Sequence, residues 1–402
     1  MSLVVGRSNL KKMADRATDE NFLHRALDLA RQGIGLTSPN PCVGAVIVDR
    51  NGKVVGEGFH TFNGIKHAEI LALDHAGERA RGATLYLNLE PCSHQGRTGP
   101  CVDAIIAAGI RRVVASMPDP NPLVAGTGFD RLRTVGLEVE VGGLIDEARK
   151  LNESFARYIR HKVPLVTLKA AMTLDGKIAP PPTASTPQPA TGGILTPSYV
   201  TGELARAHVQ QLRHQHDAIM VGVGTIIADD PLLTDRSGKP RRRPLLRVIL
   251  DSRLRLPLES RLVKTAQDDL LVLCSFAEEK KKRRLINRGV HVEQIPRPTA
   301  AGHPDLQAVV QHLGVREIAS LMIEGGAIVN GAALASAIVD KIFFYYAPRI
   351  LGGTNSVPLA AGNGFPNITD AAMADRISLH RFGEDFAIEG YLRDPYENAL
   401  SL

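Results

Sequence analysis

The chain has 402 residues, of which 44% are hydrophobic and 4% aromatic, and its formal net charge is +6. At roughly 100 to 200 residues per domain, this length predicts two or three globular domains, and the ordinary apolar fraction argues against a disordered or fibrous chain. The longest clear apolar runs, 43–48 and 318–323, have strand length and fall short of the roughly 18 residues that a membrane-spanning helix needs.

The N-terminal segment and the number of cysteines indicate in which cellular compartment the protein is found. The only apolar run in the first 20 residues is 3–5, which is too short for a signal peptide. Four cysteines are too few to stabilise a secreted fold of this size by disulfide bonds. We interpret two of them, Cys42 and Cys274, as buried apolar side chains. We therefore expect a cytoplasmic protein without a membrane contact.

Positive charge is concentrated in the later part of the chain. Residues 1–150 carry a net charge of +1 and the remainder carries +5, much of it at 241–243 and 280–284. We interpret these two clusters as a solvated loop and a solvated helix face, not as a nucleic-acid surface. The distribution is compatible with an anionic small substrate, and no nucleic-acid partner is expected.

Helices and strands are expected to alternate in the first 160 residues. Apolar residues recur at helical spacing over 19–32, which predicts a helix there. A hairpin of two strands, 43–49 and 53–59, is expected next, because Asn51-Gly52 suits the positive φ angles of a tight turn. The next expected elements are a helix over 67–76, a strand over 83–89, a helix over 100–108, a strand over 112–116 and a helix over 145–159. This alternation predicts an α/β fold with its ligand at the strand ends.

A second α/β domain is expected to follow a boundary at 162–164. Residues 179–197 contain six prolines and predict an irregular loop. The expected strands are 165–171, 218–223, 245–250, 269–275, 318–323 and 341–346, and the expected helices are 202–214, 304–313 and 327–338. We therefore divide the chain into 1–150, a connecting segment 151–163, and 164–402.

A His, a Glu and two Cys residues follow predicted strands in the first domain. His67 and Glu69 open an expected helix, and Cys92 and Cys101 follow the next strand. One imidazole and two thiolates supply three zinc ligands and leave the fourth tetrahedral position for water, as in a catalytic zinc site. Bound zinc lowers the pKa of that water to about 7, and Glu69 can carry the proton to a leaving nitrogen.

The order of these residues adds to this interpretation. Cys101 follows Pro100, a favoured first helical residue, so its sulfur should face the positive end of a helix, which stabilises the thiolate. His-x-Glu followed by Pro-Cys and a second Cys is the signature of zinc deaminases, although eight residues rather than two separate the cysteines here. The alternative to a zinc site is that the two cysteines are core thiols and that the His and the Glu are an unrelated pair on the surface. The combination of all four residues disfavours it.

Several segments resemble a known family. They are PNP at 39–41, GFH at 58–60, HAE at 67–69, LEPCSHQGRTGPC at 89–101 and DPNP at 119–122. The resemblance is to the bacterial bifunctional riboflavin-biosynthesis proteins, in which a diaminohydroxyphosphoribosylaminopyrimidine deaminase is joined to a 5-amino-6-(5-phosphoribosylamino)uracil reductase. That family has the same eight-residue spacing between the cysteines. The likeness runs from about residue 20 to about residue 391.

The resemblance implies a fold and two reactions. An N-terminal cytidine-deaminase-like three-layer domain would deaminate 2,5-diamino-6-(5-phosphoribosylamino)pyrimidin-4(3H)-one hydrolytically by means of zinc-activated hydroxide. A C-terminal dihydrofolate-reductase-like domain would then use NADPH to reduce the ribosyl side chain of 5-amino-6-(5-phosphoribosylamino)uracil to ribityl. We expect zinc and NADPH as cofactors, phosphoribosyl pyrimidines as substrates, and a homo-oligomer, either a dimer or a tetramer.

The family match also implies site residues in the deaminase half. Glu69 would be the proton carrier and His67, Cys92 and Cys101 the zinc ligands. The base and the ribose phosphate would be held by Asn40, His60, His94, Arg97, Asp119 and Asn121. An amide can meet a pyrimidine edge and a guanidinium can grip a phosphate, but without the family an ordinary turn or loop role is an equal alternative.

In the second half, the matching segments are 169–177, 225–236, 250–252 and 323–326. Gly325-Gly326 join a strand to a helix, and bare N–H groups there can cradle a phosphate, although a packing turn is the alternative. The resemblance assigns NADPH to Met172, Tyr199, Thr225, Asp229, Ser252, Gly325, Gly326 and Ala327. It assigns the substrate to Lys169, Arg213, Leu233, Arg236 and Glu324, where surface salt bridges are the alternative for the arginines.

One region departs from the family. The connection at 179–197 is longer than usual, and Pro197 and Tyr199 stand where the family has Ser and Trp. The change keeps a stacking platform and removes one hydroxyl contact to substrate.

Two rival functions are considered. One is a nucleic-acid or free-base zinc deaminase fused to an inactive reductase-like module, which the +1 charge of the first 150 residues disfavours. The other is a non-catalytic module with a structural zinc, which has no use for the carboxylate of Glu69.

Overall fold

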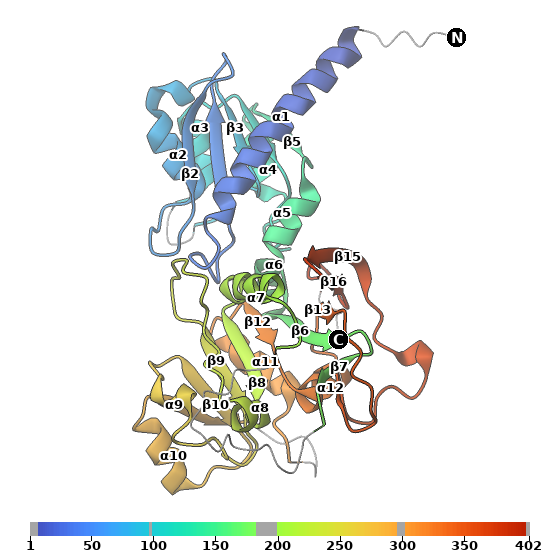
Figure 1. The fold of residues 1–402 in the computed structure, drawn as a ribbon. Coiled ribbons are helices and arrows are strands. Elements are labelled where there is room, and N and C mark those ends of the chain that lie inside the picture. The colour runs from blue at the N-terminus through green and yellow to red at the C-terminus, as the bar shows by residue number, and fades with distance from the viewer. Residues whose placement is uncertain (1–6, 96–98, 182–198, 296–301, 399–402) are drawn as a thin grey trace, which may run out of the picture. The chain divides into compact units, whose positions relative to one another are not determined.

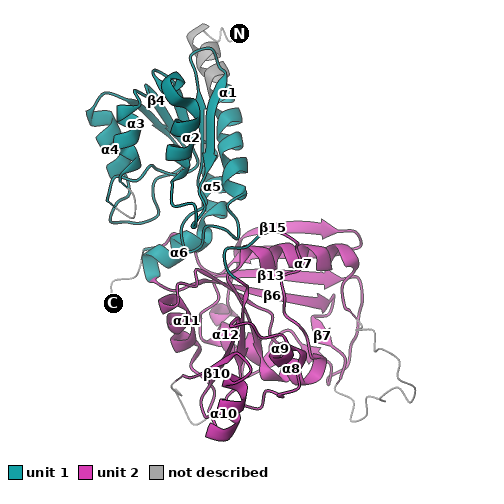
Figure 2. Cartoon of the chain, turned by 90° about the vertical axis from the view of Figure 1, so that its left-hand side faces the viewer, with its two compact units in different colours: residues 1–161, 240–243, 398–402 teal, residues 162–239, 244–397 magenta. Residues whose placement is uncertain are grey.

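The structure, a computed structural model, describes residues 7–95, 99–181, 199–295 and 302–398. The chain forms two compact units (Figure 2). Unit 1 comprises the described residues up to 161 together with 240–243 and 398, and unit 2 comprises the described residues of 162–239 and 244–397. In the described part of the chain, no helix has both the length and the apolar character needed to cross a bilayer.

Unit 1 is built on a five-stranded sheet in the order β2-β1-β3-β4-β5 (Figure 1). Its strands are β1 (Gly44–Val48), β2 (Val54–Phe59), β3 (Thr84–Leu87), β4 (Arg112–Ala115) and β5 (Glu138–Val141). Its helices are α1 (Arg7–Arg31), α2 (Ala68–Ala76), η1 (Gly77–Ala80), α3 (Cys101–Ala107), α4 (Thr127–Thr134), α5 (Ile145–Leu151) and α6 (Glu153–His161). Strand β1 is antiparallel to β2 and β3, whereas β3, β4 and β5 are parallel.

Successive side chains of β1 point to opposite faces of the sheet and belong to two separate hydrophobic cores. Ala45 and Ile47 pack with apolar residues of α2 and α3, and Val46 and Val48 pack with apolar residues of α1. Because successive strand residues point to opposite faces, helices cover both sides of the sheet, and the expected three-layer α/β arrangement is confirmed. The packing is close: a Cβ atom at Gly44 would lie 2.1 Å from the carbonyl oxygen of Ala26 in α1.

The expected elements of unit 1 are present, with differences at their ends. Helix α1 begins at Arg7, earlier than the expected residue 19. In the hairpin turn Gly52 has a φ of 80°, but Asn51 does not share a positive φ. The turn has the three residues that the expected strand bounds leave, 50–52, and the Asp49 amide closes it by donating to the Lys53 carbonyl at 2.9 Å. The hairpin is therefore confirmed, and only the positive φ expected of Asn51 was wrong.

Three other expectations for unit 1 were wrong. The helix expected over 145–159 is broken at Asn152, whose buried amide side chain pairs with the backbone N–H and carbonyl of Cys42 at 2.8 and 3.0 Å. Pro100 is the cap before α3, with φ −59° and ψ 132°, and is not its first helical residue. The loop at 241–243 is half-buried, since the guanidinium of Arg242 lies 3.4 Å from the centre of the Phe62 ring.

Unit 2 contains a nine-stranded sheet in the order β11-β10-β9-β8-β12-β6-β13-β16-β15 (Figure 1). Its strands are β6 (Leu165–Thr173), β8 (Ala218–Gly222), β9 (Leu246–Leu250), β10 (Leu270–Cys274), β11 (Val290–Gln294), β12 (Ser320–Ile323), β13 (Lys341–Ala347), β15 (Asp375–Phe382) and β16 (Asp385–Tyr391). The strands from β11 to β13 are parallel, and β16 and β15 extend the sheet in antiparallel fashion. Strands β7 (Lys177–Ala179) and β14 (Val357–Pro358) form a separate pair.

Helices cover both faces of this sheet. They are α7 (Glu203–Gln215), α8 (Val223–Asp229), α9 (Arg261–Lys264), α10 (Glu279–Ile286), α11 (Leu306–Val315) and α12 (Ala327–Ala335), with the short turn η2 (Ile368–Asp370). Apolar residues of α7 to α10 pack on one face, and those of α11 and α12 pack on the other. Parallel strands buried on both sides have their carboxyl ends at one edge, where ligands bind in such folds.

The second α/β arrangement agrees with the sequence expectations. All six expected strands are present, and α10 confirms a largely exposed helix over the basic cluster 280–284. Cys274 is fully buried and Cys42 is 9% exposed, as expected of apolar side chains. Of the expected loop at 179–197, residues 182–197 lie outside the described part of the chain.

Candidate functional site

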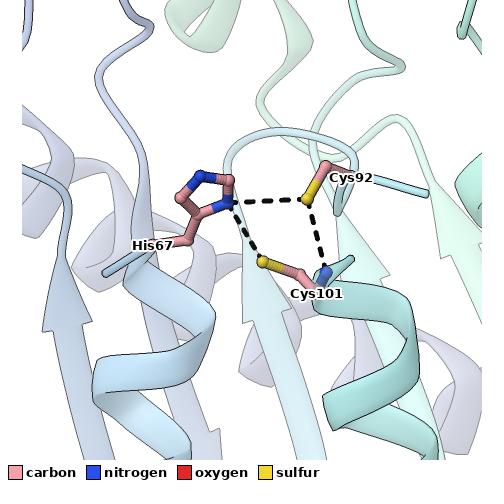
Figure 3. A group of neighbouring side chains, drawn as sticks. All are labelled: His67, Cys92 and Cys101. Carbon is pink, nitrogen blue, oxygen red and sulfur yellow. Dashed lines mark hydrogen bonds between the residues drawn. The ribbon is translucent and has the colours of Figure 1, made fainter. Parts of the chain in front are cut away.

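The ends of β3, α2 and α3 bring three metal-binding side chains of unit 1 together (Figure 3). His67 lies directly before α2, Cys92 lies in the loop after β3, and Cys101 is the first residue of α3. The Nδ1 atom of His67 is 3.1 Å from Sγ of Cys101 and 3.5 Å from Sγ of Cys92. Bond lengths of about 2.0 to 2.3 Å around a tetrahedral zinc place ligand atoms roughly 3.5 Å apart, so the set fits zinc.

The set has three members within the described part of the chain, and Glu69 is not one of them. Three protein donors leave one tetrahedral position open, which distinguishes a catalytic zinc site from a structural one. The N–H of Cys101 points to Sγ of Cys92 at 3.3 Å. The hydrogen bond between the two thiols lowers the pKa of Cys92 and raises that of Cys101. Without a metal the pair therefore shares one proton, which a bound zinc ion would displace.

Glu69 lies beside the metal-binding set in the first turn of α2, with only 3% of its surface exposed. Burial raises the pKa of its carboxyl, and the positive charge of His67 opposes that rise. A buried acid close to the metal position, but outside the ligand set, is suited to accepting and returning a proton.

Asn40 and His60 lie next to the metal-binding set on the His67 side. The amide nitrogen of Asn40 is 3.2 Å from Nε2 of His60, and Nδ1 of His60 is 3.1 Å from the carbonyl oxygen of Lys66. Since that carbonyl can only accept, His60 carries its proton on Nδ1 and accepts from Asn40 at Nε2. The rings of His60 and His67 meet edge to face, with centres 5.4 Å apart.

A loop after β4 lies on the Cys92 side. The Oδ1 atom of Asp119 accepts the N–H of Asn121 at 2.8 Å, and Oδ1 of Asn121 accepts the N–H of Leu123 at 3.1 Å. Burial raises the pKa of Asp119 to about 6; the carboxylate of Glu90 adds to the rise and a charged His94 opposes it. The structure therefore brings the expected residues His94 and Asp119 near each other, whereas Arg97 lies outside the described residues.

Unit 2 holds a cavity of about 1280 Å³ along the carboxyl ends of its parallel strands. This is larger than the roughly 300 to 1,000 Å³ of a typical small-molecule pocket, as needed for a dinucleotide and a substrate together. The expected residues that line it are Lys169, Tyr199, Arg213, Thr225, Asp229, Leu233, Arg236, Ser252, Glu324, Gly325, Gly326 and Ala327. Met172 does not line the cavity, and its side chain is buried in the core.

Glu324 organises the charges of this cavity. Its Oε1 accepts Nε of Arg213 at 2.8 Å, and its Oε2 accepts Nη2 of Arg213 at 3.1 Å and Nζ of Lys169 at 3.4 Å. Burial raises the pKa of Glu324, but the two cations outweigh it and lower that pKa to about 2. The cluster is a fixed arrangement of two positive groups around one carboxylate.

Two glycines connect β12 to α12 at the cavity wall. A Cβ atom at Gly325 would lie 2.8 Å from Cβ of Val329, so a side chain does not fit there. Gly326 precedes α12, and a Cβ atom on it would meet nothing within 4 Å. The open space before a helix N-terminus is a cradle for a phosphate group, and it fits a dinucleotide cofactor.

Some site residues were missed from the sequence. Arg206, Arg255 and His303 also line the cavity; Arg206 lies 4.5 Å from the centre of the Tyr199 ring, and Nδ1 of His303 is 2.9 Å from Oγ of Ser252. Their approach depends on where α7, the segment after β9 and the segment directly before α11 lie, for which the sequence carries no local signal.

Comparisons with known proteins agree with this geometry. The family described as the cytidine and deoxycytidylate deaminase zinc-binding region matches residues 16–117, and the RibD C-terminal domain matches residues 164–388. Riboflavin biosynthesis protein RibD of Actinobacillus pleuropneumoniae is 42% identical over 378 residues, which are 94% of this chain and 96% of that protein. The protein of the same name from Escherichia coli is 38% identical, over 92% of this chain and 98% of that protein.

Solved structures are similar over the same length. RibD of Acinetobacter baumannii has a TM-score of 0.78 at 34% identity, covering 94% of this chain and 99% of that chain. A diaminohydroxyphosphoribosylaminopyrimidine deaminase/5-amino-6-(5-phosphoribosylamino)uracil reductase from Thermotoga maritima has a TM-score of 0.76 at 32% identity, with the same coverage of both chains. The likeness therefore includes both units.

Proposed function

The chain belongs to the RibD family of bifunctional riboflavin-biosynthesis proteins, and on this premise we propose which of its residues carry the two reactions. It is a zinc-dependent hydrolytic deaminase of 2,5-diamino-6-(5-phosphoribosylamino)pyrimidin-4(3H)-one and an NADPH-dependent reductase of 5-amino-6-(5-phosphoribosylamino)uracil. It combines a cytidine-deaminase-like domain with a reductase domain of dihydrofolate-reductase-like fold. We assign the first reaction to 1–150 and the second to 164–402, with 151–163 as the connection.

In the deaminase, His67, Cys92 and Cys101 hold the zinc ion. When bound, zinc lowers the pKa of a water molecule in the open position to about 7. Glu69 would take a proton from that water as its oxygen bonds to the amino-bearing carbon of the pyrimidine, and would give the proton to the amino nitrogen as the carbon–nitrogen bond breaks and ammonia leaves. Its burial beside the ligands supports this role.

The deaminase substrate is held from two sides of the zinc ligands. Asn40 and His60 lie beside His67, and an amide can donate to and accept from a pyrimidine edge. His94, Asp119 and Asn121 lie on the Cys92 side and contact the base and the ribose. Arg97, which lies outside the described residues, binds the ribose phosphate.

In the reductase, NADPH supplies a hydride to the first carbon of the ribosyl group. Gly325, Gly326 and Ala327 hold the cofactor phosphates at the N-terminus of α12, and Tyr199, Thr225, Asp229 and Ser252, which line the same cavity, contribute further cofactor contacts. The substrate is bound by Lys169, Arg213, Leu233, Arg236 and Glu324. Of these, Lys169 and Arg213 are held by hydrogen bonds to the Glu324 carboxylate.

The observation that carries the proposal is a three-ligand metal group with a buried, non-ligating carboxylate, in the same chain as the phosphate cradle. The test is to incubate the protein with the diaminopyrimidine nucleotide, with and without NADPH, while following ammonia and nicotinamide absorbance. Ammonia should appear without NADPH, and NADPH should be consumed only after deamination. Undiminished ammonia release from protein stripped of zinc would contradict the zinc assignment.

We also propose that the protein forms a homo-oligomer through unit 2. Strand β15 lies at the edge of the described sheet, where Ile377 is 58% and Leu379 is 74% exposed. Exposed apolar side chains on an edge strand are an aggregation hazard unless another chain covers them. Light scattering should give the mass of a dimer or tetramer for the parent and of a monomer for Leu379→Lys, with Val315→Lys as the control; a monomeric parent would refute the proposal.

The cytoplasm is the proposed location. All four cysteines are free thiols, as expected in a reducing compartment. Cell fractionation should recover the protein with cytoplasmic markers, and recovery with secreted proteins would contradict this.

A further inference from the structure

Glu90 is a buried carboxylate that the catalytic scheme does not use. It lies two residues before Cys92, in the segment after β3, and only 5% of its surface is exposed. A buried carboxylate is costly unless its oxygens are fully hydrogen-bonded, so its partners indicate what it does.

Four backbone N–H groups donate to this carboxylate. Oε2 accepts those of Asp119 at 2.9 Å and Gly126 at 2.8 Å. Oε1 accepts those of Gly128 at 2.7 Å and Phe129 at 3.4 Å. Three of these donors precede or open α4, where the helix dipole also favours a negative charge.

The carboxylate therefore joins three parts of unit 1. They are the segment that carries the ligand Cys92, the loop after β4 that begins at Asp119, and the N-terminus of α4. Close packing at Gly128 supports this connection, because a Cβ atom there would lie 2.3 Å from the carbonyl oxygen of Pro91 and 3.0 Å from Oε1 of Glu90.

We propose that Glu90 is a positioning residue of the deaminase, which fixes the substrate loop at 119–121 relative to the zinc ligand Cys92. The proposal rests on the substrate role given above to Asp119 and Asn121. Glu90 itself touches neither the substrate nor the metal. It sets where the Asp119 backbone stands, and Asp119 in turn holds Asn121 through the 2.8 Å bond to its N–H.

The test replaces Glu90 by Gln, which keeps the size of the side chain. An amide retains one oxygen acceptor, but its NH2 group faces N–H donors, so at least one pair of hydrogen bonds is lost. The KM for the diaminopyrimidine nucleotide should rise at least about tenfold, with kcat changed much less. Zinc content should stay at one ion per chain, because the three ligands are unchanged.

Two further variants separate positioning from general stability. Gly128→Ala keeps the carboxylate but forces α4 away from it, and it should raise KM in the same direction. Asp119→Asn should raise KM by itself, and the double variant Glu90→Gln/Asp119→Asn should raise KM by less than the product of the two single effects. Glu78→Gln, at an exposed acid in η1 directly after α2, is the matched control and should behave as the parent.

The outcomes are distinguishable. An unchanged KM in Glu90→Gln, multiplicative effects in the double variant, or loss of zinc from Glu90→Gln would overturn the positioning role. Failure of both Glu90→Gln and Gly128→Ala to fold would also overturn it, since stability alone would then explain Glu90. If Asp119→Asn has the parent KM, the substrate role of Asp119 fails first, and this inference fails with it.

Discussion

Two glutamates with little exposed surface, Glu69 and Glu324, illustrate how surroundings set the state of one side-chain type. Burial raises the pKa of Glu69, and His67 opposes the rise without cancelling it. Burial acts in the same direction on Glu324, but Lys169 and Arg213 lower its pKa to about 2. Glu69 is therefore suited to exchanging a proton, and Glu324 is suited to being a permanent negative charge.

Replacing Glu324 by Ala should impair the NADPH-dependent step alone. The change leaves Lys169 and Arg213 without their shared carboxylate, and breaking a buried ion pair costs about 3 to 5 kcal/mol. We expect kcat/KM for NADPH oxidation with the uracil nucleotide to fall at least about tenfold, and ammonia release to stay within about twofold of the parent. Glu279→Ala, at an exposed position on α10, is the control, and an equal loss of deamination would show that Glu324 supports the whole fold.

The site residues were predictable from the sequence to unequal degrees. The metal ligands His67, Cys92 and Cys101 could be grouped from the sequence because few residue types bind zinc and each follows a predicted strand. In the structure their ligand atoms lie within 4.8 Å of one another. Glu90 and Arg206 could not be identified, because their roles depend on side-chain direction. An acid beside an apolar strand has the same sequence pattern whether it caps a distant helix or faces solvent.

At the scale of elements, hydrophobic periodicity predicted most of the buried strands and helices. It missed two strands in which apolar and polar residues do alternate, β5 and β15. Strand β5 is mostly exposed, and β15 has an almost wholly exposed burial pattern. The break between α5 and α6 depends on Asn152 pairing with the distant backbone of Cys42, a tertiary contact that no local pattern reports.

The buried carboxylate of Asp19 connects helix α1 to the sheet through hydrogen bonds. Arg112 of β4 donates to both oxygens of Asp19 at 2.9 and 2.7 Å, and the hydroxyl of Tyr86 donates at 2.8 Å. Burial raises the pKa of Asp19, but these hydrogen bonds more than offset it and lower that pKa below its ordinary value of 3.8. A depressed pKa in the folded state contributes stability above the ordinary pKa, which is lost as the pH falls through the depressed one.

Asp19→Asn should therefore destabilise unit 1 in a pH-dependent way. The free energy of unfolding should fall by about 1 to 3 kcal/mol at pH 7, seen as a lower Tm in thermal unfolding. The difference from the parent should shrink as the pH falls below about 4. Asp28→Asn, at an exposed ion pair of the same helix, should show little change, and a gap that widens at low pH would contradict the assigned sign.

At the scale of the whole molecule, two units of different architecture each place their site at strand or helix ends. The expected α/β character of both halves is confirmed, because parallel strands buried on two faces leave long apolar runs in the sequence. The order of the nine strands in unit 2 was not predictable, since it depends on which strands pair across long stretches of chain. The exposed edge at β15 was missed for the same reason.

One chain carries two separable reactions in a fixed order, deamination first. The order can be measured with Glu69→Gln, assayed with both nucleotides in the presence of NADPH. With the diaminopyrimidine nucleotide, ammonia release and NADPH oxidation should both fall at least about 100-fold, while 5-amino-6-(5-phosphoribosylamino)uracil should still oxidise NADPH at the parent rate. NADPH oxidation at the parent rate from the diaminopyrimidine nucleotide, or its loss with the uracil nucleotide, would contradict the account.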